Sequence, residues 1–391
     1  MTNASPVLAL NSGSSSLKFG LYSVGASSTE MLLSGEAEAI GDGRGKFWAR
    51  DANGEQRISE ATAVPTQRDA ILHIGRLLAD CKLPAPAAIG HRVVHGGTRL
   101  RRHCLIDETV LRELEVATVF APLHAPAALS VIRFAQEHFP QCAQAACLDT
   151  AFHAQLPEVA RTLPIAKELR SDGIQRYGFH GLSCESVVRQ LGRDLPERLI
   201  IAHLGNGASV TAVKHGESID TSMGLTPTGG VIMGTRCGDL DPGVLVYLLR
   251  EKNFDATRLE DLVNHRSGLL GISEIDGNMR RLHEAARSDS DAQLAIQMFC
   301  YSVRKQVAAM IAALDGLDLL VFSGGIGEND ANVRAAICGG LSWLGIVLDA
   351  ARNRSLEDPI NGSTSRCSVR VLPAEEDVQI ARHTWELVNV A

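Results

Sequence analysis

Residues Leu8–Lys18 read LALNSGSSSLK, an apolar run, a turn of glycine and serine, and a lysine on the returning run. Val7–Asn11 and Leu17–Val24 are strand-like on either side of Gly13–Ser16, which predicts a hairpin. Such a turn presents backbone N–H groups and hydroxyls to one point in space, as phosphate sites do, and Lys18 adds a point charge. The plain alternative is a polar hairpin turn, for which glycine and serine are the usual residues.

Two later stretches repeat this pattern. Leu199–Val210 (LIIAHLGNGASV) again places a glycine turn between two strand-like runs, and Leu319–Asn329 (LLVFSGGIGEN) joins an apolar strand to glycines ahead of a predicted helix over Ala331–Cys338. The last stretch lacks the third glycine of the dinucleotide fingerprint, and no Walker A pattern occurs anywhere, which argues against a Rossmann oxidoreductase and against P-loop chemistry. Three such loops indicate a protein that holds a nucleotide and moves its terminal phosphate.

Strands alternate with helices along the rest of the chain, which predicts α/β architecture. The predicted helices are Asp69–Cys81, Thr109–Val119, Ala127–His138, Pro242–Arg250, Ala292–Leu314 and Asp377–Val388. The further strands are Ile89–Val94, Ala145–Leu148, Leu317–Phe322 and Val369–Pro373, and Ala286–Gln293 is expected to be a polar loop. A chain of 391 residues exceeds one hydrophobic core. The two hairpins therefore suggest a duplicated α/β domain, with a cleft between the copies and a boundary near Thr150.

Composition limits the classes of partner. A net charge of −7 argues against a nucleic-acid groove but not against small anions, which a local group of arginines can bind. Nine scattered cysteines without a CxxC pair predict free thiols in a reducing compartment. The start of the chain lacks the features of a signal peptide, and no apolar run approaches the length of a membrane span, so we expect a cytoplasmic protein that does not enter a membrane.

The stretch Gly90–Gly97 (GHRVVHGG) places His91 and His95 four residues apart, a spacing that would pair them on a zinc ion if the segment were helical. The valines favour a strand instead, where the two positions lie roughly 13 Å apart. The same alternation puts Arg92 and Val94 on one face of that strand. A guanidinium beside an apolar spot suits a small carboxylate with a short alkyl tail.

Other candidate residues sit in short glycine- or proline-flanked motifs. Met233–Gly243 (MGTRCGDLDPG) places Arg236 between glycines, although a surface turn with a local Arg–Asp pair explains it equally well. His180 lies in YGFHG, His124 in APLHAP, and Asp149 ends an apolar strand, where α/β sheets place their ligand-binding groups.

Glu375, Glu376 and Asp377 form an acidic cluster where the last strand meets the last helix. They either complement the helix dipole or hold a magnesium ion through water.

Taken in order, these motifs resemble the acetate kinase family of the sugar-kinase, heat-shock ATPase and actin superfamily. The matching stretches run through the whole chain: LALNSGSSSLK, IGHRVVHGG, APLHAP, LDTAFH, RYGFHG, HLGNGAS, MGTRCGDLDPG, FSGGIGEN and the PAEED ending. The resemblance implies two actin-like (ribonuclease H-like) domains over residues 1–150 and 151–376, with a final helix at about 377–391 that packs back on the first. It further implies a homodimer that transfers the γ-phosphoryl group of ATP to acetate by in-line displacement. The products are acetyl phosphate and ADP, the transfer is reversible, and the metal is magnesium or manganese.

The same resemblance assigns roles to particular residues. Arg92 and Arg236 would clamp the carboxylate and the phosphoryl group, His180 would stabilise the transition state with support from His124, and Asp149 would position an arginine or the metal. The acyl pocket would comprise Arg92, Val94, Leu123, Phe179 and Pro227. The nucleotide would be bound by Ser14, Ser16, Lys18, His203, Leu204, Gly205, Asn206, Gly207, Asn278, Met279, Arg280, Gly325, Ile326, Gly327, Glu328 and Asn329. The metal would lie near Asn11 and Glu376.

Two positions depart from the family pattern. Asn278 stands where an aspartate is usual near the adenosine, and Asp377 stands where a second glutamate is usual. Within the class, a propionate or butyrate kinase is the alternative, since one methylene group is worth only ~1–3 kcal/mol. A non-catalytic actin-like ATP-binding protein is the alternative from another class. That alternative predicts loss of Arg92, Arg236 or His180, and all three are present.

Overall fold

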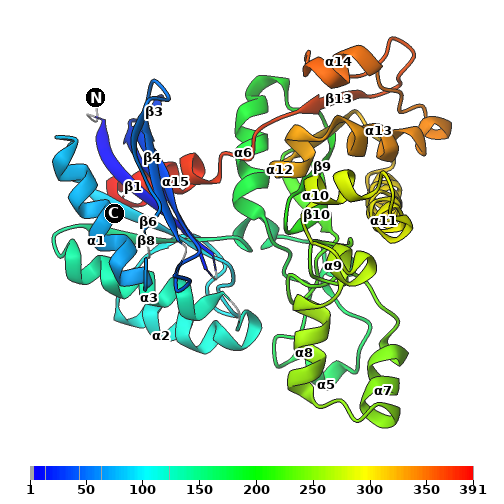
Figure 1. Ribbon diagram of the computed structural model, residues 1–391, viewed down its shortest axis with the longest axis horizontal. Helices are drawn as coiled ribbons and strands as arrows, with labels where there is room; N and C mark the ends of the chain where they lie inside the picture. The colour runs from blue at the N-terminus through cyan, green and yellow to red at the C-terminus, as the bar shows by residue number, and fades with distance from the viewer. Residues whose placement is uncertain (1–3, 14, 44, 63, 123, 391) are drawn as a thin grey trace. The chain divides into compact units, whose positions relative to one another are not determined.

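The structure is a computed structural model that describes residues 4–13, 15–43, 45–62, 64–122 and 124–390. The chain divides into two compact units. The first comprises Met1–Ala154 and Glu375–Ala391, and the second comprises Gln155–Ala374. The C-terminal segment therefore returns to the unit in which the chain begins (Figure 1).

The first unit is built on an eight-stranded sheet with the strand order β5-β4-β3-β2-β1-β6-β8-β7. Strands β1, β6 and β8 are mutually parallel at its centre, and β2 to β5 form an antiparallel meander on one side. The strands are β1 Ser5–Ser12, β2 Leu17–Val24, β3 Thr29–Glu38, β4 Lys46–Asp51, β5 Gln56–Glu60, β6 Ala88–Val93, β7 Cys104–Leu105 and β8 Ala143–Leu148. The helices are α1 Gln67–Asp80, α2 Glu108–Val116, α3 Ala125–His138 and α15 Glu376–Val390.

The second unit has a five-stranded sheet with the order β11-β10-β9-β12-β13. Its strands are β9 Arg198–Leu204, β10 Ala208–Lys214, β11 Glu217–Thr221, β12 Leu319–Ser323 and β13 Ser368–Val371. Its helices are α4 Glu158–Arg161, α5 Lys167–Arg170, α6 Gly181–Leu191, α7 Pro242–Glu251, α8 Ala256–His265, α9 Gly268–Ser273, α10 Met279–Ala285, α11 Ser290–Leu314, α12 Gly324–Asn329, α13 Ala331–Gly339 and α14 Ala350–Ser355.

The two sheets share one topology, which confirms the predicted duplication. In each unit an antiparallel hairpin is followed by a strand that pairs in parallel with the first strand of the hairpin, and then by a strand that pairs in parallel with that one. The order β3-β2-β1-β6-β8 in the first unit thus corresponds to β11-β10-β9-β12-β13 in the second. Both glycine turns predicted from the sequence lie at equivalent places, between the two strands of each hairpin.

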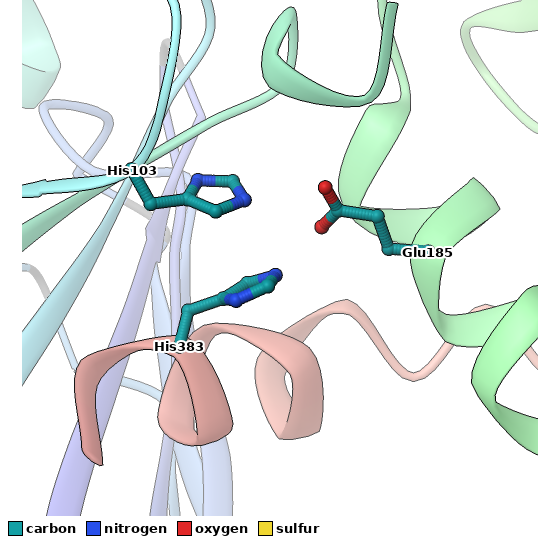
Figure 2. Close-up of side chains that lie close together, drawn as sticks. All are labelled: His103, Glu185 and His383. Atoms are coloured by element: carbon teal, nitrogen blue, oxygen red, sulfur yellow. The ribbon is translucent and has the colours of Figure 1, made fainter. Parts of the chain in front are cut away.

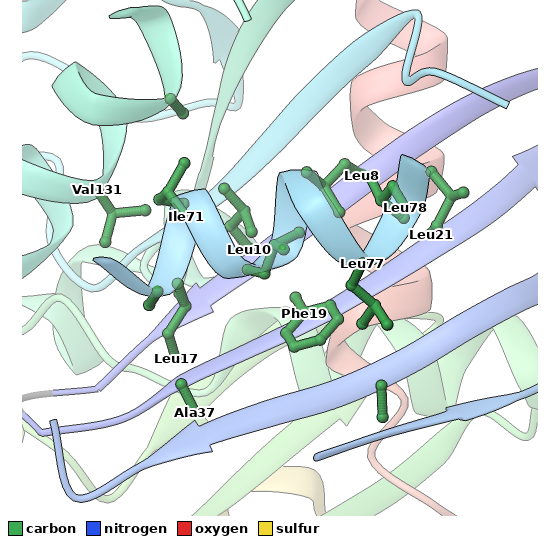
Figure 3. Packing of buried hydrophobic residues seen from close by; sticks show 14 of the residues in the cluster. Leu8, Leu10, Leu17, Phe19, Leu21, Ala37, Ile71, Leu77, Leu78 and Val131 are labelled. Carbon is green, nitrogen blue, oxygen red and sulfur yellow. The ribbon is translucent and has the colours of Figure 1, made fainter. Parts of the chain in front are cut away.

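The core of the first unit packs helix α1 against the first hairpin. Helix α1 starts at the cap residue Thr66, whose hydroxyl accepts the Asp69 N–H, and its apolar residues lie at helical spacing. Figure 3 shows Ile71, Leu77 and Leu78 of this helix over the side chains of β1 and β2. Helix α15 covers the opposite face, where a Cβ at Gly90 of β6 would meet α15 side chains.

The structure corrects three expectations. Strands β3 to β5 were not predicted, because these outer strands are rich in charged residues and contain few apolar ones in a row. The Gly324–Asn329 segment is itself the helix α12 and not a loop. The Ala286–Gln293 segment is a loop only in its first half, because α11 starts at Ser290, where the Asp289 carboxylate caps it.

Candidate active site

Three polar side chains lie at the carboxyl ends of the neighbouring parallel strands β1, β6 and β8. They are Asn11, Arg92 and Asp149, and the strand pairing brings them together from positions far apart in the chain. Ligand-binding groups of α/β sheets collect at this edge. The sheet topology therefore places three of the predicted site residues in one cluster.

Arg92 is the centre of this cluster. Its Nε and Nη2 atoms donate to one oxygen of Asp149, Oδ2, at 2.9 and 2.6 Å, and its Nη1 donates to Asn11 Oδ1 at 3.1 Å. Nη1 also lies 3.6 Å from Glu376 Oε2. Asp149 is buried and its own N–H donates to the Val93 carbonyl, so the carboxylate that holds the guanidinium is itself fixed.

Asn11 connects Arg92 to the acidic start of α15. Its Nδ2 donates to Glu376 Oε2 at 3.1 Å and to Asp377 Oδ1 at 3.2 Å. The Arg92 guanidinium needs a hydrogen-bond acceptor, and the carboxylates need a donor. These partners therefore fix the orientation of the Asn11 amide. Asn11 therefore turns its nitrogen toward the predicted metal side and its oxygen toward Arg92.

The charges of the cluster depend on one another. Burial works against the charge on Arg92, but the neighbouring Asp149 and Glu376 carboxylates raise its pKa, so the guanidinium stays charged. Burial raises the pKa of Asp377, against the Asn11 hydrogen bond and the positive charges of Lys18 and Arg92, which lower it. Lys18 pairs across the hairpin with Asn11, and directly opposed residues of an antiparallel pair share a face of the sheet.

The second unit holds its own cluster around the β9–β10 turn. His180 precedes α6 with a left-handed backbone (φ 60°), a conformation that is uncommon for residues other than glycine and frequent at functional sites. Its Nδ1 lies 3.0 Å from the Ser209 hydroxyl, and its ring stacks on His203 at 4.3 Å between centroids. His203 is in turn bonded to the Ser183 hydroxyl at 2.8 Å.

Gly207 shows that two of the predicted catalytic side chains converge. A Cβ at Gly207 would lie 3.0 Å from Arg236 Nη2 and 3.1 Å from His180 Nε2, so any larger residue would have to displace one of these side chains by a few tenths of an ångström. Arg236 Nη1 donates to the Pro227 carbonyl at 2.6 Å. A guanidinium and an imidazole nitrogen thus meet above the bare backbone of the turn.

The aspartates near Arg236 have other partners. Asp239 accepts the Gly230 N–H, and Asp241 caps α7 by accepting the Gly243 N–H. Both aspartates therefore bind backbone N–H groups, one at Gly230 and one at the start of α7.

The two predicted adenosine-side segments lie at helix starts. Asn278 caps α10, because its side-chain oxygen accepts the Arg280 N–H at 3.0 Å. Asparagine and aspartate cap helices equally well, so the departure from the family pattern keeps this role. In α12, the Glu328 carboxylate accepts the N–H groups of Gly324 and Ala374. The Glu328 carboxylate thus stabilises its own segment and is directed back toward the backbone.

Several predicted nucleotide-binding side chains are buried. Leu204 and Met279 are core residues, so only their backbone atoms can meet a ligand, and His203 supports His180. Gly205 and Asn206 form the turn itself, since Gly205 N–H donates to the Gly207 carbonyl and the Asn206 carbonyl accepts the Gly234 N–H. Six residues of the adenosine-side segments have some exposure: Asn278, Arg280, Gly325, Ile326, Glu328 and Asn329. Gly327 is buried.

The remaining candidates lie as follows. In the first hairpin, Ser16 closes the turn through its carbonyl, which accepts the Gly13 N–H. His124 stands at the start of α3. Val94 and Phe179 of the predicted acyl pocket are buried. Ser14 and Leu123 lie outside the described residues.

The histidines of GHRVVHGG each have a hydrogen bond of their own. His91 is bonded to Gln144, and His95 accepts the Gly97 N–H and stacks on Phe120.

The first unit also contains a histidine pair that the sequence did not predict. Figure 2 shows His103 and His383 with their rings one above the other, 3.9 Å apart between centroids. His103 Nδ1 accepts the N–H of Leu148, the residue before Asp149, so the pair joins α15 to the end of β8. The two residues are far apart in sequence and neither lies in a recognisable motif, so only the fold reveals the pair.

Comparison with known proteins gives one consistent result. The sequence matches the acetokinase family over residues 6–382. It is 40% identical to an acetate kinase of Rhodopseudomonas palustris, covering 98% of each chain, and 41% identical to one of Nitrobacter hamburgensis, covering 98% of this chain and 96% of the relative. Among solved structures, a propionate kinase from Francisella tularensis is similar with a TM-score of 0.92 at 38% identity, covering 98% of this chain and all of that one. An acetate kinase from Porphyromonas gingivalis has a TM-score of 0.87 at 35% identity with the same coverage.

Proposed function

This chain belongs to the acetokinase family, and from that premise we propose that it transfers the γ-phosphoryl group of ATP to acetate, reversibly, to give acetyl phosphate and ADP. The observation that best supports this assignment is the convergence of Arg236 and His180 over Gly207. Two donors directed at one point above bare backbone suit an anion with several oxygens. The transferring phosphoryl group is such an anion.

The reaction is chiefly an electrostatic problem. Acetate and the γ-phosphoryl group are both negative, so their repulsion must be cancelled before an acetate oxygen can attack phosphorus in line. Phosphoryl transfer needs little covalent assistance from the protein beyond alignment and charge stabilisation. Arg92 and Arg236 supply positive charge with planar, bidentate geometry that lysine lacks.

Each arginine is held for this role by a different device. The buried Asp149 carboxylate grips Nε and Nη2 of Arg92, so this aspartate is a positioning residue in our proposal. The Pro227 carbonyl holds Nη1 of Arg236 and leaves Nη2 over the turn. His180 is oriented by Ser209 at one nitrogen, so its other nitrogen is directed toward the same turn. Fixed donors lower the barrier because they need no reorganisation during the reaction.

The acidic start of α15 fits a magnesium site. Glu376 and Asp377 direct carboxylate oxygens at one amide group, and burial raises the pKa of Asp377. Oxygen ligands of this kind suit Mg²⁺ or Mn²⁺. When bound, the ion supplies charge neutralisation at the phosphate oxygens. Because the Asn11 nitrogen donates to both carboxylates, we assign Asn11 the task of orienting them, and Glu376 and Asp377 the task of facing the hydrated ion.

We also propose that the chain forms a homodimer through α7. This helix reads PGVLVYLLRE, and none of its ten residues, all of which the structure describes, is buried. Val244, Val246, Tyr247 and Leu249 are each more than two-fifths exposed. Its first eight residues carry no charge, so a second copy of the same helix can pack on it without like-charge repulsion.

No helix in the described part of the chain combines the length and apolar character needed to cross a bilayer. All nine cysteines are free thiols. Free thiols are typical of proteins in a reducing compartment, and ATP is a substrate found inside cells. We therefore propose that the protein is located in the cytoplasm.

The test is a comparison of acyl substrates with the purified full-length protein. We expect ATP turnover that requires acetate and magnesium and that yields an acyl phosphate, trapped as its hydroxamate. Propionate and butyrate run in parallel decide chain length, because the solved relatives include a propionate kinase. If kcat/KM is higher with propionate than with acetate, propionate is the substrate in place of acetate. If no carboxylate yields an acyl phosphate, the proposal is rejected.

A further inference from the structure

A buried arginine outside the predicted site joins three helices of the second unit. Arg334 of α13 is 1% exposed, and its Nη1 donates to the carbonyls of Gly327 and Glu328 at 2.8 and 2.9 Å. Its Nε and Nη2 donate to the side-chain and backbone oxygens of Asn353 in α14, each at 2.8 Å. The guanidinium therefore fixes the second half of α12 relative to α13 and α14.

This arrangement carries an energetic cost that calls for an explanation. Burying a guanidinium is unfavourable unless its N–H groups are all satisfied, and hydrophobic residues often stabilise a fold as well or better. Burial indeed lowers the pKa of Arg334, while the Asp330 carboxylate raises it. A lysine or an apolar residue would not reach three elements at once, whereas the planar fork of arginine does.

Asp330 extends the connection to a fourth helix. Its Oδ1 caps α13 by accepting the N–H groups of Asn332 and Val333 at 3.1 and 3.0 Å. Its Oδ2 lies 2.7 Å from Nε2 of His283, which belongs to α10. One carboxylate thus ties α10 to the junction between α12 and α13.

The cluster is closed by Asn353, whose Nδ2 donates to the Ala331 carbonyl at 2.8 Å. We name His283, Asp330, Arg334 and Asn353 the helix-joining cluster. None of them was predicted as a site residue, but the elements they join carry both adenosine-side segments: Asn278–Arg280 at the start of α10 and Gly325–Asn329 in α12.

We propose that the helix-joining cluster sets the spacing between α10 and α12 and thereby positions the groups that bind the nucleotide. Its members are positioning residues, because Arg334 is buried and acts only through the α12 carbonyls that it holds. The inference rests on the proposed function, since it takes these segments as the nucleotide site. It assigns nucleotide affinity to the cluster and leaves acetate binding to other residues.

The experiment uses Asp330→Asn and Arg334→Lys in the full-length protein. Asparagine still caps α13 but loses the charge that faces His283, and lysine keeps the positive charge but loses the fork. We expect the Kd for magnesium-ADP, by calorimetric titration, and the KM for ATP to rise by about tenfold, equivalent to about 1.4 kcal/mol. The KM for acetate should stay unchanged.

Arg304→Lys is the matched control. Arg304 of α11 donates to the Ala336 carbonyl on another face of α13, away from α12, so its loss should leave ADP binding unchanged. A lower melting temperature in Asp330→Asn and Arg334→Lys with wild-type Kd for ADP would reduce the cluster to a purely stabilising role and overturn the inference. Wild-type protein that fails to bind ADP would overturn the proposed function itself.

Discussion

At the scale of single residues, Arg92 has two tasks that substitution can separate. It neutralises the buried Asp149 carboxylate through two of its nitrogens, and it presents its third nitrogen beside Asn11 and Glu376. In our proposal the first task supports the fold and the second supports catalysis. A lysine can satisfy the charge of Asp149 but cannot reproduce the three-nitrogen geometry.

We therefore expect Arg92→Lys to fold with nearly the wild-type melting temperature and to lose about 10³-fold or more in kcat, the scale of an arginine that stabilises phosphoryl transfer. Arg92→Ala should lose a similar factor and also unfold more easily, because it leaves a carboxylate buried without its cation. Steady-state kinetics and thermal denaturation measure the two effects. Near-normal kcat in Arg92→Lys would remove this arginine from the chemistry.

His91 gives a prediction about pH. Burial lowers its pKa to about 4, against the Gln144 hydrogen bond, which raises it, so the folded protein keeps the ring neutral. The unfolded chain binds a proton near pH 6.5. The stability contributed by the neutral ring is therefore present above that pH and is lost as the pH falls toward 4.

We expect His91 to reduce the free energy of unfolding by about 2 kcal/mol between pH 7 and pH 5, and His91→Gln to remove that part of the pH dependence. Urea denaturation at the two pH values measures it. His215→Asn is the control, because that histidine is two-thirds exposed and should leave the slope unchanged. A slope that survives in His91→Gln would show that other groups dominate acid unfolding.

At the scale of elements, the turn between β9 and β10 is the connection of the second unit at which we expect an added side chain to disturb the site. Its backbone supports Gly234 through the Asn206 carbonyl, and Gly207 leaves room for Arg236 and His180. A methyl group added at Gly207 would lie about as close to the Arg236 and His180 side chains as atoms in real structures approach one another.

Gly207→Ala should therefore displace Arg236 or His180 and lower kcat by at least about tenfold, as small misplacements at reacting groups do. The fold should persist, because Gly207 does not have a positive φ. The control is Gly339→Ala, since a Cβ there meets no atom within 4 Å. Equal activity in the two variants would refute the tight convergence at the turn.

The sequence predicted the elements that depend on local signals such as turns and helix caps. It did not predict the strands that depend on pairing with neighbouring strands. Both hairpins were predictable because glycine turns separate apolar runs, and α1 because a threonine cap precedes helical periodicity. Strands β3 to β5 depend on neighbours in the sheet for their stability. The α12 helix was missed because three of its six residues are glycine, the poorest helix former apart from proline.

The same distinction applies to the candidate site. Motifs identified Arg92, Arg236 and His180, but not what holds them. The convergence at Gly207 and the double grip of Asp149 arise from side chains that the sheet brings together across long sequence separations. Residues assigned to the nucleotide from motif position alone, such as Leu204 and Met279, proved to be core residues, because a motif does not show which side chains point inward.

At the scale of the whole molecule, the Arg236 loop is bonded to α8, the helix that follows the exposed helix α7 along the chain. The carbonyl of Asn264 in α8 accepts the Thr235 hydroxyl, and the Val263 carbonyl accepts the Cys237 N–H. The residues on both sides of Arg236 are thus bonded to α8. None of the ten residues of α8, all described, is buried in the chain. A partner subunit packed on α7 would therefore also restrain the loop that carries Arg236.

We expect the protein to sediment as a dimer and Tyr247→Glu to shift it to monomer at micromolar concentration, because a charge would enter the centre of an apolar interface. The kcat of the monomer should fall by about tenfold, since the Arg236 loop loses its support, while ADP binding remains.

Trp343→Glu provides the control. This tryptophan is 74% exposed on another helical turn of the same unit, so the substitution adds the same charge to an exposed aromatic position without touching α7. It should leave both the sedimentation coefficient and kcat unchanged. A Tyr247→Glu protein that stays dimeric would move the interface away from α7, and a fully active monomer would separate dimer formation from the Arg236 loop.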